Sequence, residues 1–254
     1  MSESSCTHDQ QVIELYTALA NNPARDFGWE KGRQNALNHG YNETWIAHLP
    51  AQLWDYCAAV GNPFTACAFR AGATVLDLGC GAGVDLCVAA LLVGAQGTVI
   101  GVDITPAMVQ LARLHAIQAK LENIIVHEAS IEQLPLPDNS VDIIISNGAI
   151  NLAGSKQKVF EEAWRILRPG GRLSIADMIR DEPCEQVHSC DNDSWADCVA
   201  GTLDKQELLD IMKTSGFHAP ECVATTHYRT ARTTVGATFR ASKVTDTGNT
   251  VHAG

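Results

Sequence analysis

The chain has 254 residues, of which 46% are apolar, which suits one decorated domain and excludes a disordered chain. Its 29 Asp and Glu outnumber its 18 Lys and Arg, and the net charge of −11 argues against nucleic acid and favours a small-molecule partner. No stretch reaches the ~20 apolar residues of a membrane-spanning helix. The nine cysteines form no Cys-x-x-Cys pair and no zinc motif, so we expect a cytoplasmic protein with no membrane contact and no bound metal.

Residues 1–68 carry no strand pattern and predict a helical segment. Val12, Leu15, Tyr16 and Leu19 fall at helical spacing, and the segment holds three of the five Trp and three of the four Tyr. We expect it to form a lid over the site described below.

Short apolar runs alternate with helical patterns in residues 69–241, which is typical of a parallel sheet in an α/β fold. An irregular insert over 181–203 follows the fifth run, and we expect it to roof the same site as the lid; the small, polar residues 242–254 predict a mobile tail. The expected strands lie near 74–78, 98–102, 123–127, 141–146, 172–177, 221–227 and 233–241. The expected helices lie near 83–93, 106–119, 155–167 and 204–215.

A glycine-rich turn follows the first strand, in Val75-Leu-Asp77-Leu-Gly79-Cys80-Gly81-Ala-Gly83. Glycines let the backbone turn tightly and approach a ligand closely. A dinucleotide site has the spacing G-x-G-x-x-G, whereas the glycines here run G-x-G-x-G behind an aspartate. S-adenosylmethionine carries an ammonium and a sulfonium but no phosphate, so a carboxylate at Asp77 suits it. The alternative is an ordinary tight turn between a strand and a helix.

A second acid, Asp103, ends the next apolar strand, 20 residues beyond Gly83. An acid at this strand tip can accept hydrogen bonds from both hydroxyls of a ribose. A solvated loop aspartate would not explain its place at the end of an apolar strand.

Together these residues resemble the class I S-adenosylmethionine-dependent methyltransferases, and so do Leu134–Asp142 and Leu167–Leu173. The resemblance implies a Rossmann-like, seven-stranded, mainly parallel sheet with an antiparallel last strand. It also implies that Ser130 replaces the Asp or Glu that many members place at the adenine amino group. The Ser146-Asn147-Gly148 run lacks the Asn/Asp-Pro-Pro-aromatic pattern expected of enzymes that methylate nucleobases. The implied cofactor residues are Asp77, Gly79, Cys80, Gly81, Gly83, Asp103, Ile104, Met108, Ser130, Ile131 and Asn147.

Within the class, Gly101–Met108, Ser146–Leu152 and Cys198–Leu203 are similar to the arsenite methyltransferases. Cysteines from separate loops gather around As(III) in that family, since this soft ion prefers thiolates. Of the cysteines that the resemblance implies, only Cys198 is present. Val60 and Gly148 occupy the places of two others, and Cys57 or Cys190 could substitute.

The candidate substrate residues are Asn151, Trp195 and Cys198, and each has a structural alternative as a turn residue or as core packing. Trp29, Tyr41 and Trp45 could wall the pocket, and no catalytic residue is assigned. No nucleophile of the protein is expected, because the transfer is a displacement that the cofactor itself drives. We expect a methyltransferase acting on a small-molecule acceptor. The alternatives are arsenite methylation and, more distantly, cofactor binding without turnover.

Overall fold

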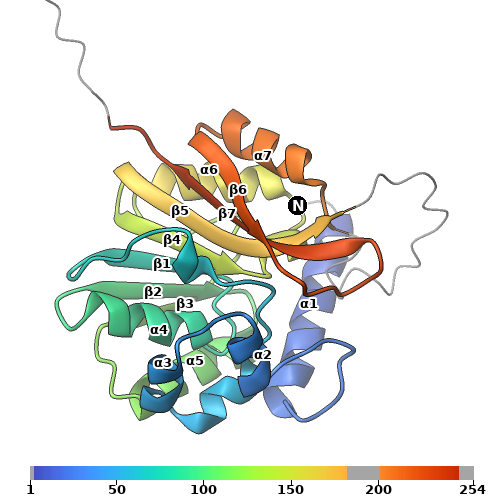
Figure 1. The fold of residues 1–254 in the computed structure, drawn as a ribbon, viewed down its shortest axis with the longest axis vertical. Coiled ribbons are helices and arrows are strands. Elements are labelled where there is room, and N and C mark those ends of the chain that lie inside the picture. Colours follow the sequence, from blue (N-terminus) through green and yellow to red (C-terminus); the bar gives the residue numbers. More distant parts are fainter. Residues whose placement is uncertain (1–2, 182–200, 246–254) are drawn as a thin grey trace, which may run out of the picture.

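The computed structural model describes residues 3–181 and 201–245 of the chain. Its centre is a seven-stranded sheet with the strand order β3-β2-β1-β4-β5-β7-β6 (Figure 1). The strands from β3 to β5 are parallel, and β7 is antiparallel to both of its neighbours, as predicted. The strands are β1 (Thr74–Leu78), β2 (Thr98–Asp103), β3 (Ile124–Glu128), β4 (Val141–Asn147), β5 (Leu167–Arg180), β6 (His218–Thr225) and β7 (Thr234–Ser242).

The central strands are apolar on both faces because helices cover both. Side chains alternate across a strand, so Leu76, Leu78 and Ile144 pack on one face with the buried side of α6, while Val75 and Ile143 pack on the other face with α4 and α5. These helices start and stop within about one residue of the predicted ranges. They are α4 (Val84–Val93), α5 (Pro106–Gln118), α6 (Lys156–Ile166) and α7 (Lys205–Thr214). The predicted α/β fold is confirmed.

The fifth strand is longer than predicted. Leu167 already pairs with Val141, and the register then shifts so that Arg172 pairs with Ile143. Residues 168–171, which precede the expected strand, therefore form a bulge within β5, with Gly170 at φ +80°. Bulges insert extra residues without ending a strand, and a short-range pattern cannot distinguish them from a turn.

The first residues of the expected tail are part of the fold. Ser242 ends β7, and the buried Lys243 donates from Nζ to Asn139 Oδ1 and to the Trp164 carbonyl, both at 2.8 Å. The prediction that 242–254 forms one mobile tail is thus wrong at its start, because Lys243 finds acceptors that lie far away in sequence.

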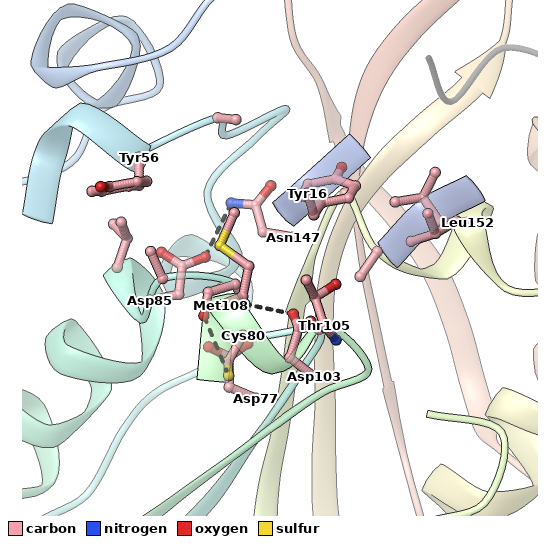
Figure 2. A pocket seen from close by; sticks show the side chains of 18 of the residues that line it. Tyr16, Tyr56, Asp77, Cys80, Asp85, Asp103, Thr105, Met108, Asn147 and Leu152 are labelled. Atoms are coloured by element: carbon pink, nitrogen blue, oxygen red, sulfur yellow. Dashed lines mark hydrogen bonds between the residues drawn. The ribbon is translucent and has the colours of Figure 1, made fainter. Parts of the chain in front are cut away.

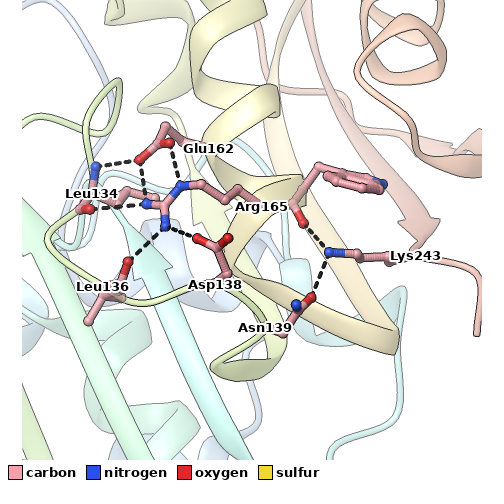
Figure 3. A network of polar contacts seen from close by, with 8 residues as sticks. Leu134, Leu136, Asp138, Asn139, Glu162, Arg165 and Lys243 are labelled. Atoms are coloured by element: carbon pink, nitrogen blue, oxygen red, sulfur yellow. Dashed lines mark hydrogen bonds and ion pairs between the residues drawn. The ribbon is translucent and has the colours of Figure 1, made fainter.

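The loop between β3 and β4 is tied to α6 by Arg165 (Figure 3). Its guanidinium donates to both oxygens of Glu162 at 2.7 and 2.8 Å, to Asp138 at 2.6 Å and to the Leu136 carbonyl at 2.9 Å. Glu162 in turn accepts from the Leu134 amide at 2.8 Å. This network fixes the chain that leads from the edge of the site back into the sheet.

Only helices precede β1 in the described residues, as predicted. They are α1 (Glu3–Asn21), α2 (Arg33–Asn38), α3 (Glu43–His48) and two 3₁₀ helices, Ala51–Tyr56 and Pro63–Thr65. Leu53 and Trp54 are fully buried in one cluster with Val84 and Val88 of α4, so residues 33–65 form part of the core. Nearly all of the expected insert over 181–203 lies outside the described residues. No helix in the described ranges is long and apolar enough to span a membrane.

Candidate functional site

A pocket lies at the carboxyl ends of β1, β2 and β4, where the glycine turn, Asp103 and Asn147 meet (Figure 2). This is the edge at which parallel α/β sheets bind ligands. Every cofactor residue predicted from the sequence lines the pocket except Gly83. Gly83 instead caps α4 at φ +92°, where a Cβ would lie 3.2 Å from the Cα of Ala112.

The glycine turn is anchored to the sheet and open to the pocket. The amides of Gly79 and Cys80 donate to the Val102 carbonyl at 2.8 and 3.0 Å. Gly79 has φ +69°, and a Cβ there would lie 2.3 Å from the Cβ of Ala149. Gly81 has φ +50° but faces open space, since a Cβ on this residue would have no neighbouring atom within 4 Å. A ligand can therefore approach Gly81 closely, while the Gly81 amide itself donates to Asp103 Oδ2.

Asp103 is oriented by two backbone amides. Its Oδ2 accepts from Gly81 at 2.9 Å and its Oδ1 accepts from Thr105 at 2.8 Å. The Thr105 hydroxyl also donates to this carboxylate. A carboxylate has about four acceptor positions, so at least one is left for a ribose hydroxyl. Burial raises the pKa of Asp103, and these three hydrogen bonds partly oppose that rise.

Asp77 is the buried acid below the turn. It is 1% exposed, and no described residue gives its Oδ2 a hydrogen bond. Burial raises the pKa of Asp77 strongly, and the neighbouring carboxylates of Asp85 and Asp103 raise it further. A buried, unpartnered acceptor is costly, and an ammonium group would relieve both the missing bond and the repulsion. Asp77, Asp103 and the open backbone at Gly81 thus fit S-adenosylmethionine.

A third buried acid, Asp85, was missed from the sequence. It lies in the first turn of α4, and its Oδ1 accepts from the Tyr41 hydroxyl at 2.5 Å. Asn147 donates from Nδ2 to Asp85 Oδ2 at 3.1 Å and to Tyr41 Oη at 3.0 Å. Burial raises the pKa of Asp85 to about 6, opposed by the bonds from Tyr41 and Asn147. The available signal was a carboxylate inside an otherwise apolar helix, directly after the glycine turn.

Helix α1 contributes the side of the pocket opposite the sheet. Asp9, Val12, Tyr16 and Leu19 line it from successive turns. His8 holds this helix in place, since its Nε2 lies 2.7 Å from the Leu152 carbonyl. Of the aromatic residues proposed as a wall, Trp29 and Tyr41 line the pocket, whereas Trp45 packs edge-on against Tyr41 and Phe64 behind it.

Asn151 corrects a prediction. The sequence suggests a substrate residue here, but Asn151 is buried behind the pocket and donates from Nδ2 to Asp177 Oδ1 at 2.8 Å and to the Met178 carbonyl at 2.5 Å. Its own amide donates to Asp177 Oδ2 at 3.2 Å. Asn151 therefore fixes the loop after β4 to β5. The other two substrate candidates, Trp195 and Cys198, lie outside the described residues, as does Cys190.

The two positions that hold cysteine in the arsenite methyltransferase pattern lie side by side. A Cβ on Gly148 would be 3.7 Å from Val60, and both residues line the pocket. Cys57 also lines it, but its buried thiol donates to Asn35 Oδ1 at 3.6 Å, and burial raises the pKa of that thiol. No group of three or more His, Cys, Asp or Glu in the described ranges is arranged to hold a metal ion.

Comparison with known proteins agrees with this geometry. The family model described as "Methyltransferase domain" matches residues 69–216. An arsenite methyltransferase of Halobacterium salinarum is 44% identical over 72% of this chain and 46% of its own length. One of Aquipseudomonas alcaligenes is 35% identical over 70% of this chain and 54% of its own. The chain thus spans about half the length of these curated relatives.

Among solved structures, an arsenic(III) S-adenosylmethionine methyltransferase from Chlamydomonas reinhardtii superposes with a TM-score of 0.71 at 32% identity. The match covers 80% of this chain and 73% of that one. The similarity therefore extends beyond the sheet into the surrounding elements.

Proposed function

The chain belongs to the S-adenosylmethionine-dependent methyltransferases, and we propose that it transfers a methyl group to a small-molecule acceptor. The observation that carries the proposal is the buried, unpartnered Oδ2 of Asp77 beside the open backbone at Gly81. The ammonium of the cofactor would donate to Asp77 Oδ2, and the cofactor needs the space beside Gly81. Asp103 adds the acceptors that a ribose requires.

The charge of the pocket narrows the acceptor class. The charged side chains that line the pocket are all carboxylates: Asp9, Asp77, Asp85, Asp103 and Glu132. All 18 Lys and Arg of the chain fall in the described ranges, and none is among the lining residues. Carboxylates repel an anion at close range in a partly desolvated site. This supports a neutral or cationic acceptor rather than a carboxylate, a phosphate or a nucleic acid.

The residues of this chain would act by holding and aligning. S-adenosylmethionine, when bound, supplies a methyl group on a sulfonium that is already activated for displacement. Asp77 would bind the amino-acid portion of the cofactor and Asp103 its ribose, and α1 would exclude water from above. Alignment of two reactants alone accounts for a large share of such a rate enhancement, so the pocket needs no nucleophile of its own.

Arsenite methylation is the second candidate, and the 44% identity to the Halobacterium protein favours it. Thiolate capture of As(III) needs converging sulfurs, whereas Val60 and Gly148 carry none. Burial raises the pKa of the pocket thiols Cys57 and Cys80, which keeps them protonated. These features support an organic acceptor over the metalloid. Cofactor binding without turnover stays a distant third candidate.

Two measurements test the proposal. In calorimetric titrations the protein should bind S-adenosylmethionine and S-adenosylhomocysteine but not NAD, and NAD binding without either would contradict the cofactor assignment. Incubation with S-adenosylmethionine, arsenite and a thiol reductant should yield little or no methylated arsenic. Robust product that is lost in Cys57→Ser or Cys198→Ser would instead establish arsenite as the acceptor.

A further inference from the structure

The loop at the edge of the pocket where the resemblance places the adenine has one carboxylate, and that carboxylate is tied to another element. Ser130, Ile131 and Glu132 line the pocket there, next to Ile104. Ser130 Oγ accepts from the Glu132 amide at 3.2 Å. The Glu132 carboxylate accepts from the Ser155 amide at 2.9 Å, which commits it to the start of α6. The loop after β3 therefore offers the amino group of a base a shared hydroxyl and a carboxylate that is already engaged by α6.

Helix α1 brings another acid to this edge. Asp9 lines the pocket, and its charge is close enough to Glu132 for the two to repel. Partial burial raises the pKa of Asp9, and Glu132 adds to that rise while His8 opposes it. No described residue donates a hydrogen bond to the Asp9 side chain. The carboxylate is thus held in a pocket, half-buried, without the donor that would stabilise it.

The position of Asp9 is fixed by its neighbours on α1. His8 contacts the Leu152 carbonyl at 2.7 Å, and the buried Val12 and Leu19 continue along the same side of the helix. Asp9 and Glu132 thus line the same pocket, close enough for their charges to interact, although they lie far apart in sequence.

We propose that Asp9 on α1 accepts a hydrogen bond from the exocyclic amino group of the adenine and so selects adenine over an oxo-purine. The inference rests on the proposed function, because it requires S-adenosylmethionine in this pocket. An ionised carboxylate is an acceptor only. It pairs with an amino group and is repelled by the carbonyl oxygen that hypoxanthine carries at the same position.

The test compares two ligands on two variants of the full chain. The ligands are S-adenosylhomocysteine and S-inosylhomocysteine, which differ at position 6 of the purine, amino in one and oxo in the other, and in the proton that the oxo form carries on N1. The wild-type protein should prefer adenine by at least about tenfold, because Asp9 gains a charge-assisted hydrogen bond from the amino group and avoids repulsion by a carbonyl oxygen. Asp9→Ala should reduce that preference to within about threefold, mainly by weakening S-adenosylhomocysteine. Glu14→Gln is the matched control, because Glu14 is an exposed acid on the same helix, and it should keep the full preference.

The outcomes separate the inference from the function on which it rests. If Asp9→Ala binds S-adenosylhomocysteine and keeps the wild-type preference, or if the wild type shows no preference, Asp9 does not read the base. If the wild type binds neither ligand, the proposed function itself is wrong. Circular dichroism and thermal melting confirm that each variant is folded, and Asp9→Asn, which retains an acceptor oxygen, should show an intermediate preference.

Discussion

The pocket has a floor and a cover that are built in different ways. The floor consists of Asp77, the 79–83 turn, Asp103 and Asn147, and backbone hydrogen bonds to β2 hold its turn in place. The cover is α1, which reaches the rest of the molecule through apolar packing and a few polar contacts, such as Tyr56 Oη to the Ala20 carbonyl at 3.4 Å. The floor is therefore part of the sheet, whereas the cover is an added element that contributes no strand to it.

The region from α2 to the second 3₁₀ helix belongs to neither side of this comparison. It supplies Tyr41 to the pocket, yet Leu53 and Trp54 are buried against α4. The segment predicted as a lid, residues 1–68, thus consists of α1, which covers the pocket, and of residues 33–65, which form part of the core.

Deletion separates these two parts and gives the largest expected effect. Removing residues 1–22 should leave a protein that unfolds cooperatively but binds S-adenosylhomocysteine at least about tenfold more weakly, since several buried side chains of the pocket are lost. Removing residues 1–70 should abolish cooperative unfolding, because it exposes Val84, Cys87 and Val88 of α4. Chemical denaturation followed by fluorescence distinguishes the two. If the 71–254 fragment still unfolds cooperatively, the segment before residue 71 is not needed to hold α4 on the sheet.

A pair of glycine substitutions tests the floor at the next level of effect. Gly79→Ala combines a left-handed φ with a 2.3 Å approach to Ala149 Cβ, so it should lower the free energy of unfolding by on the order of 2–4 kcal/mol. Gly81→Ala has the same backbone strain but meets open space, so it should cost about 1 kcal/mol. Its methyl group should instead enter the pocket and weaken S-adenosylhomocysteine. Equal losses of stability in both variants would mean that the close approach to Ala149 adds nothing to the cost of Gly79→Ala.

Most residues of the floor could be brought together from the sequence, because they lie close to one another along the chain. Apart from Asn147, these residues lie within 27 positions, from Asp77 to Asp103, and the ends of strands in parallel sheets meet at one edge. The strands and helices of the sheet were predictable for the same reason, since their apolar periodicity is a property of short segments.

Residues whose partners lie far away in sequence were not predictable. Asn151 turns to Asp177 on β5, 26 residues away, and nothing in its own loop reveals that choice. Asp85 meets Tyr41, 44 residues earlier, which converts a helical acid into part of the site. Asp9 reaches the pocket only because α1 packs across it.

A further expected effect is a pH dependence of stability that arises from Asp85, which joins the floor to Tyr41 in the segment between α2 and α3. Burial raises the pKa of Asp85 from 3.8 to about 6, so the folded protein holds a proton that the unfolded chain has lost between those values. The contribution of Asp85 to stability is therefore fully present below about pH 4 and is lost as the pH rises through about 6. The loss should be on the order of 1–3 kcal/mol.

Cofactor affinity should change in the opposite direction over the same range. Above about pH 6 the ionised Asp85 adds negative charge beside Asp77, which favours a cationic ligand. Asp85→Asn cannot titrate, so it should reduce the slopes of both the melting temperature and the S-adenosylmethionine affinity between pH 4.5 and 7.5. Asp177, whose pKa burial also raises to about 6, should leave a residual slope in the melting temperature. The exposed Glu14→Gln variant should keep the wild-type slopes. If Asp85→Asn retains both slopes, another group in the pocket carries the titration, and Asp77, whose pKa burial raises strongly, is the next to replace.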